Sequence, residues 1–165
     1  MASTDDKVIL KSSEGECFEV DMAVACHLQI VKSVLEDCEG SSDKVVSLFV
    51  VEAKYVAMII EYYKTYVELE EKHEEGGFEE KLKEFEKQFL EQIDKIELKG
   101  LVMAVNYLNA PAMFDAVCTT IAKHIENKSV EYVREYFGIV NDFTPEEEAQ
   151  IREEHRWAYD GVNDD

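Results

Sequence analysis

Cysteine and histidine side chains are the residues of this chain that could carry chemistry. The four cysteines (Cys17, Cys26, Cys38 and Cys118) form no Cys-x-x-Cys pair and no pattern with histidine that is typical of zinc sites. The four histidines are scattered, and none belongs to a motif that pairs it with a serine or cysteine nucleophile. The sequence also contains no glycine-rich phosphate-binding motif. These observations predict a non-enzymatic protein without cofactor or metal.

Cys118 is the one thiol for which a covalent role is a defined alternative, as the nucleophile of a thiol-dependent transferase. It lies on the apolar side of a predicted helix, whereas reactive thiols need an accessible, electropositive setting. We therefore expect Cys118 and the other cysteines to be small packing residues in a reducing compartment. Resistance of Cys118 to thiol labelling in the folded protein would remove the transferase alternative.

Length and charge limit the partners that the chain can have. With 165 residues, of which 46% are hydrophobic, it is expected to form one compact domain or a domain with an extension. Its formal charge of −20 would repel nucleic acids and anionic membrane surfaces. A long apolar run and a signal-peptide pattern are not visible. We expect an intracellular, soluble protein whose partners are other proteins.

The N-terminal part has the pattern of a small sheet with helices. Alternating apolar residues around the turn Ser12–Gly15 predict a β-hairpin. A tyrosine-rich stripe at helical spacing predicts a core-facing helix. The expected elements are the hairpin at 7–20, a short helix at 22–27 capped by Asp21, a helix from about Ile30, a strand at 45–51 and the tyrosine-rich helix at 53–67.

Residues 68–84 are dominated by charge and include Gly76-Gly77. High charge opposes compaction, so we expect an acidic linker or loop here. Phe78, Leu82 and Phe85 would alternatively form a weak helical stripe after the glycines. The stretch lacks the residue pattern of a calcium-binding loop.

The remaining chain is predicted to be helical. Phe89 to Ile93 suggests a short helix, and Asp94 caps the next helix, in which Gly100 costs about 1 kcal/mol relative to alanine. Pro111 starts a helix whose apolar side is broad enough to face a core and still leave residues for a partner. A further helix is expected between Ser129 as its cap and Gly138 as its stop.

The last predicted helix lies in Asn141–Ala158 and has a well-marked start. Thr144, Pro145 and Glu147 form a capping box with proline at the first helical position. The body is polar, but Trp157, the only tryptophan, lies near its end. Trp157 is either a local packing residue or the anchor of a partner-binding helix.

Three segments resemble the Skp adaptor family: VILKSSEGECFEVD, FLEQIDKIELKGLVMAVNYLNAPAMFDAVCTTIA and NDFTPEEEAQIREEHRW. Their sequences look most similar to those of plant members. The resemblance covers nearly the whole chain. It implies an α+β fold, with a BTB/POZ-like N-terminal domain that has a small, mainly three-stranded sheet, followed by a C-terminal helical F-box-binding extension. The expected parts are 1–67 and 85–128 for the BTB/POZ-like core, 68–84 for the acidic linker, and 129–165 for the extension with its acidic tail.

The family's role implies an adaptor that links a cullin scaffold to F-box substrate receptors in SCF ubiquitin ligases, supporting protein ubiquitination in the cytoplasm and nucleus. The cullin N-terminal domain would contact Asn106, Tyr107 and the loop after the second N-terminal helix. The positions that would contact F-box proteins are apolar: Val102, Phe114, Val117, Ile121, Val133, Phe137, Ile139 and Trp157.

The chain departs from the family pattern in three places. Leu48–Val51 replaces a Leu-Pro-Asn-Val segment, Lys99 stands where an apolar residue is common, and an acidic tail follows Trp157. These differences leave an alternative open: a diverged BTB-like dimerisation or F-box-binding scaffold that no longer docks on cullin. A weak homodimer in the unbound state is part of that expectation.

Overall fold

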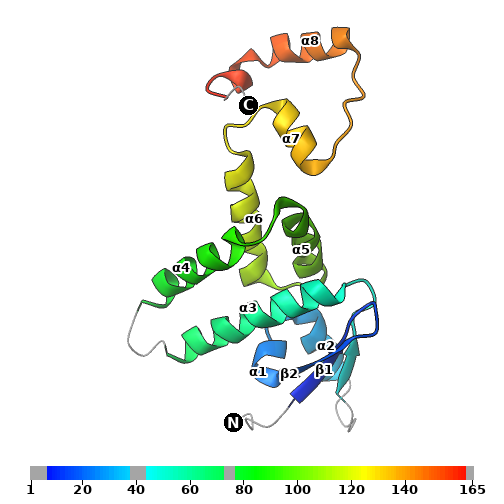
Figure 1. Ribbon diagram of the computed structural model, residues 1–165, viewed down its shortest axis with the longest axis vertical. Coiled ribbons are helices and arrows are strands. Elements are labelled where there is room, and N and C mark those ends of the chain that lie inside the picture. Colours follow the sequence, from blue (N-terminus) through cyan, green and yellow to red (C-terminus); the bar gives the residue numbers. More distant parts are fainter. Residues whose placement is uncertain (1–6, 38–43, 73–76, 163–165) are drawn as a thin grey trace. The chain divides into compact units, whose positions relative to one another are not determined.

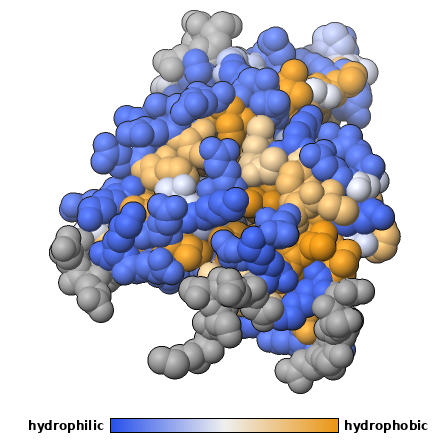
Figure 2. Space-filling model, turned by 60° about the horizontal axis from the view of Figure 1, so that its bottom comes forward, coloured by the Kyte–Doolittle hydropathy of each residue, from blue (hydrophilic) through white to orange (hydrophobic). Residues whose placement is uncertain are grey.

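The computed structural model describes residues 7–37, 44–72 and 77–162, and Figure 1 shows the arrangement of its helices and strands. The chain forms two compact units, unit 1 (Met1–Cys118) and unit 2 (Thr119–Asp165). The boundary lies inside helix α6 (Pro111–Ile125), so this helix contributes residues to both units. Hydrophilic residues cover much of the face in Figure 2, with apolar residues between them. No helix of the described ranges is both long and apolar enough to cross a membrane.

A three-stranded sheet opens unit 1, with the strand order β2-β1-β3. Strands β1 (Lys7–Lys11) and β2 (Cys17–Asp21) are antiparallel, and β3 (Val45–Ser47) runs parallel to β1. Val8 and Leu10 are buried, whereas Ile9 between them is exposed, as the alternation predicts. Gly15 has a φ of +88°, which glycine adopts without strain. The predicted hairpin and its turn are confirmed.

Strand β3 is shorter than predicted. The prediction of a strand over 45–51 is wrong beyond Ser47, because the chain turns there and Val51 N–H donates to the carbonyl of Leu48 at 3.3 Å. Leu48 and Val51 are buried, while Phe49 is 80% exposed and Val50 is also exposed. An apolar, β-branched sequence is compatible with a strand and also with this turn. The two structures differ in which of its side chains are buried.

Six helices make up most of the rest of the described part of unit 1, and the start of α5 is fixed by a side-chain cap. Asp94 accepts hydrogen bonds from Ile96 and Glu97 N–H, which confirms the predicted cap, whereas Asp21 makes no side-chain cap bond. Figure 1 shows α3 running between the sheet with α1 and α2 on one side and α4 and α5 on the other. The helices are α1 (Met22–Ala25), α2 (Gln29–Asp37), α3 (Ala53–Glu71), α4 (Phe78–Glu91), α5 (Lys95–Tyr107) and α6.

Aromatic side chains join α3 and α4, the two helices that contain most of the residues expected to form an acidic linker. The ring of Tyr62 lies 5.7 Å from Phe85 and 6.1 Å from Phe89, centroid to centroid, and its hydroxyl donates to Glu86 at 2.7 Å. The linker prediction is therefore wrong for residues 68–71 and 78–84, which are helical. Residues 73–76 lie outside the described part. Burial of these rings outweighs the charge that opposes compaction.

Gly100 in α5 makes room for a tyrosine of α3. A Cβ atom at this position would lie 1.7 Å from the hydroxyl oxygen of Tyr55, far inside van der Waals contact. Tyr55 is buried, so its ring fills the space that a larger residue at position 100 would need. The cost of glycine in a helix is thus offset by a close helix–helix approach that the sequence alone did not reveal.

Unit 2 contains the end of α6, then α7 (Val130–Phe137), α8 (Pro145–Glu154) and the 3₁₀ helix η2 (Arg156–Tyr159). The predicted capping box of Thr144 and Glu147 is present, and Ser129 caps α7. Gly138 ends α7 with a φ of +68°. The prediction of one helix through Ala158 is wrong at its end, because α8 stops at Glu154 and Trp157 lies in the tighter η2 turn.

Candidate protein-binding surfaces

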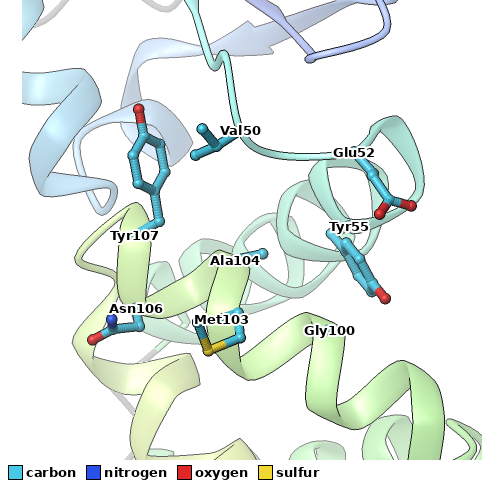
Figure 3. Close-up of a pocket in the computed structure, with 8 residues that line it drawn as sticks. All are labelled: Val50, Glu52, Tyr55, Gly100, Met103, Ala104, Asn106 and Tyr107. Carbon is cyan, nitrogen blue, oxygen red and sulfur yellow. The ribbon is translucent and has the colours of Figure 1, made fainter.

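A groove of about 430 Å³ lies on unit 1 between the segment after β3 and helix α5. Its lining includes Asn106 and Tyr107, the two residues carried over as cullin contacts. Figure 3 shows Val50 and Tyr107 at one end of the groove and Tyr55 beside Gly100 at the other. The structure therefore brings both residues together on an accessible surface. Their role in binding cullin stays a prediction, and the loop 38–43, also assigned to that surface, lies outside the described residues.

Exposed apolar side chains surround this groove, and the sequence reasoning missed two of them. Val50 and Met103 both line it and are exposed. Met103 precedes Asn106 by three residues and Tyr107 by four, so it shares their side of α5. That spacing was the signal that could have identified Met103. Phe49, which precedes Val50 in the same turn, adds a large exposed ring.

The predicted F-box contacts are divided between the two units. In unit 1, Val102 and Phe114 are partly buried, and Val117 has no exposed surface. The side chain of Val117 therefore belongs to the core of the partner-free chain and offers no surface to a partner in this state. Val102 and Phe114 retain some accessible area for contact.

In unit 2, exposure increases along the chain. Ile121 is buried and Val133 is partly buried, whereas Phe137 and Ile139 are exposed and Trp157 is 75% exposed. Sequence reasoning overlooked two exposed neighbours, Val140 and Phe143, in the connection between α7 and α8. Apolar residues directly after a helix-ending glycine were the available signal. Large exposed apolar side chains concentrated in one segment indicate an interaction surface.

The capping box at the start of α8 favours a negative charge on Glu147. The Thr144 backbone N–H donates to Glu147 Oε2 at 2.9 Å, and the Thr144 hydroxyl donates to the same oxygen at 3.0 Å. These bonds hold the pKa of the Glu147 carboxyl below its usual range. A charged Glu147 is thereby favoured at the positive end of the helix dipole.

The described thiols lie in settings that do not activate them. Burial, followed by the charge of Asp115, raises the pKa of Cys118, which is the opposite of what a nucleophile needs. Cys17 and Cys26 are exposed, so their prediction as packing residues is wrong, and Cys38 lies outside the described residues. Cys17 sits at an outward position of the edge strand β2, which alternation explains. Within the described ranges, no histidine, cysteine and carboxylate side chains are grouped so as to hold a metal ion.

The fold and surfaces define a protein-interaction chain: a small sheet-and-helix unit, then a helical unit with exposed apolar residues. Profiles of the Skp1 family match residues 6–68 (tetramerisation domain) and 111–158 (dimerisation domain). SKP1-like protein 4 of Arabidopsis thaliana is 38% identical over 97% of this chain and 100% of its own length. SKP1-like protein 1A of the same plant is 40% identical over 93% and 98%. The chain belongs to the Skp1 family, which confirms the resemblance to plant members and the α+β fold.

Proposed function

We propose that the chain is a non-enzymatic adaptor that bridges a cullin scaffold and F-box substrate receptors in an SCF ubiquitin ligase. The observation that carries the proposal is the match to both domains of the Skp1 family along nearly the full chain. The two exposed apolar surfaces, one on each unit, support it, because an adaptor needs two separate binding sites. Such an adaptor would work in the cytoplasm and nucleus, where its protein partners act.

The F-box would bind the exposed apolar side chains of unit 2. Trp157, Phe137 and Ile139 are the exposed members of the predicted contact set and the expected anchors, with the two aromatic residues first, because large aromatic residues dominate interface energies. The acidic first turn of α8 would favour a partner with a basic or mixed surface and would increase the association rate.

Cullin would bind the groove of unit 1 through Asn106, Tyr107 and the apolar side chains around them. Phe49 and Val50 replace the family's Pro-Asn pair here and remain exposed, so this chain presents a more apolar rim. An apolar rim favours a partner that also offers apolar side chains at this point.

The same turn supports a second candidate, a diverged scaffold that binds F-box proteins without docking on cullin. Exposed Phe49 and Val50 would clash with or fail to match a surface adapted to the common segment, and they would favour weak self-association instead. The thiol-transferase alternative has lost support, because burial raises the pKa of Cys118.

Co-elution on a sizing column tests the proposal. The purified chain is mixed with an F-box domain and a cullin N-terminal domain that do not bind each other. A ternary peak establishes bridging. A complex with the F-box domain but not with the cullin domain supports the diverged scaffold. A dimer of the unbound chain in light scattering would strengthen that support. A folded chain that binds neither partner overturns both candidates.

A further inference from the structure

Helix α8 buries no side chain, yet it lies beside α7 in unit 2. The contact between the two helices is made by charged residues. Arg134 Nη1 lies 3.0 Å from Glu148 Oε1, and the Arg152 guanidinium pairs with Glu131. Arg152 also lies 3.4 Å from Glu148 on its own helix. We call these four residues, Glu131, Arg134, Glu148 and Arg152, the charge ladder.

The spacing of the charge ladder determines the direction and register of the helix pair. Glu131 and Arg134 are three residues apart on α7, and Glu148 and Arg152 are four apart on α8, so each pair shares one helix face. The earlier residue of α7 pairs with the later residue of α8, which requires antiparallel helices. A parallel arrangement would place Glu131 against Glu148 and Arg134 against Arg152, two repulsive pairs.

The Arg134–Glu148 contact is the most protected part of the ladder. Their side chains are only 18% and 25% exposed, whereas Glu131 in the other pair is 61% exposed. Asn141, in the connection before α8, donates its side-chain amide to Glu148 Oε2 at 3.2 Å. Arg134 first, then Asn141, hold the pKa of Glu148 below its usual range, so the carboxylate stays charged.

The ladder continues to the turn that carries Trp157. The Arg152 guanidinium lies over the ring of Tyr159 in η2, 5.2 Å from its centroid, and Arg156 pairs with Glu153 of α8 at 3.1 Å. Trp157 lies between these two contacts in sequence and remains exposed. The charged residues thus restrain the backbone around Trp157 without covering its ring.

We propose that Arg134 and Glu148 are positioning residues, which hold α8 and the Trp157 turn on α7 before a partner arrives and so preset Trp157 for binding. This inference rests on the proposed F-box binding to unit 2. A helix of ten residues with no buried side chain is marginal by itself. Without the ladder, only the fraction of molecules with α8 in place would bind directly, and the apparent affinity would fall by that fraction.

Hydrogen exchange of the full-length chain, without partner and at low salt, tests the positioning first. The variants are Arg134→Met, Glu148→Gln and the double variant. Glu126→Gln, which removes one exposed carboxylate of unit 2 outside α7 and α8, is the matched control. We expect the amides of α8 to exchange about threefold or more faster in all three variants, because each change removes the Arg134–Glu148 contact. Glu148→Gln also weakens the contacts to Arg152 and Asn141, so it should have at least as large an effect as Arg134→Met, and the double variant should exchange no faster than Glu148→Gln. Unchanged exchange overturns the inference.

Affinity for an F-box domain tests the consequence. Each single variant is expected to bind about threefold or more weakly, the double variant no more weakly than Glu148→Gln, and the Glu126→Gln control about as well as the wild type. Raising the salt concentration should reduce the difference in affinity between the wild type and the variants, because salt screens the ion pairs of the charge ladder. Equal affinities of wild type and variants overturn the positioning role. If the wild type binds no F-box domain, the proposed function fails, and hydrogen exchange alone then decides whether the ladder holds α8.

Discussion

Replacing Gly100 by alanine tests whether Tyr55 is the reason for a glycine inside α5. In an open helix this change stabilises by about 1 kcal/mol, because alanine has the better helix propensity. Here the new Cβ would lie 1.7 Å from Tyr55 Oη and 2.2 Å from Cζ, so the buried ring has to move. Overpacking of this kind costs about 1–3 kcal/mol. With an overlap this deep we take the upper part of that range, which leaves a net destabilisation of about 1–2 kcal/mol.

A double-variant cycle separates the two contributions. In a Tyr55→Ala background the ring is gone, and Gly100→Ala should then stabilise by about 1 kcal/mol. The sign of the effect therefore reverses between the two backgrounds. Tyr55→Phe is the matched control, because it removes the hydroxyl but leaves Cζ 2.2 Å from the new methyl group, so it should relieve only part of the clash.

Urea unfolding followed by circular dichroism gives the free energies, and thermal unfolding should move in parallel, by about 2–4 °C for each kcal/mol in a chain of this size. The free-energy change of each variant is calculated from the shift of its midpoint urea concentration, provided that the m-value stays constant. Stabilisation by Gly100→Ala in the wild-type background, or the same sign in both backgrounds, would refute the reasoning. Either result would mean that Tyr55 gives way at little cost and that another cause keeps glycine at this position.

Three further predictions concern the two surfaces and one partly buried histidine. Trp157→Ala should weaken F-box binding by about 2 kcal/mol or more, and an unchanged affinity in calorimetry would remove Trp157 as an anchor. Lysine at Asn106 and Tyr107 should abolish co-elution with cullin but preserve F-box binding, whereas loss of both would indicate misfolding. Burial, partly opposed by Glu70, lowers the pKa of His27 below 6.5. The unfolded chain then takes up the proton first, so this contribution to stability is present above about pH 6.5 and is lost as the pH falls. Urea midpoints at about pH 7.5 and 5.5 should differ less in His27→Gln than in the wild type, and equal differences would contradict this.

Elements whose ends are determined by neighbouring residues could be predicted from the sequence. The hairpin turn at Gly15, the cap of α5 by Asp94 and the capping box of Thr144 all depend on residues within a few positions of one another. Each uses backbone conformations or side-chain oxygens that particular residue types supply. Such signals are complete within a short window, and the structure reproduces them.

Features that depend on distant residues could not be predicted. The turn at Phe49 and Val50, rather than a longer strand, depends on which side chains the rest of unit 1 buries. Helix α4 depends on Tyr62 of α3, which supplies the aromatic contacts that make a charged segment fold. Gly100 is unfavourable for helix α5 on its own, and only the adjacent ring of Tyr55 explains it. In each case the deciding partner is far away in the chain, and composition alone pointed the other way.

The polar character of α8 has a different meaning once its contacts are known. A polar helix has no apolar face with which to pack on its own chain, and this favours a partner-binding role. The charge ladder supplies a different means of packing, because a polar helix can be held by ion pairs to a neighbour. The ladder accounts for the charged residues of α8, but it leaves the ring of Trp157 uncovered. The argument for a partner therefore rests on Trp157 and the exposed residues after α7, and the helix itself acts as the support that holds Trp157 in place.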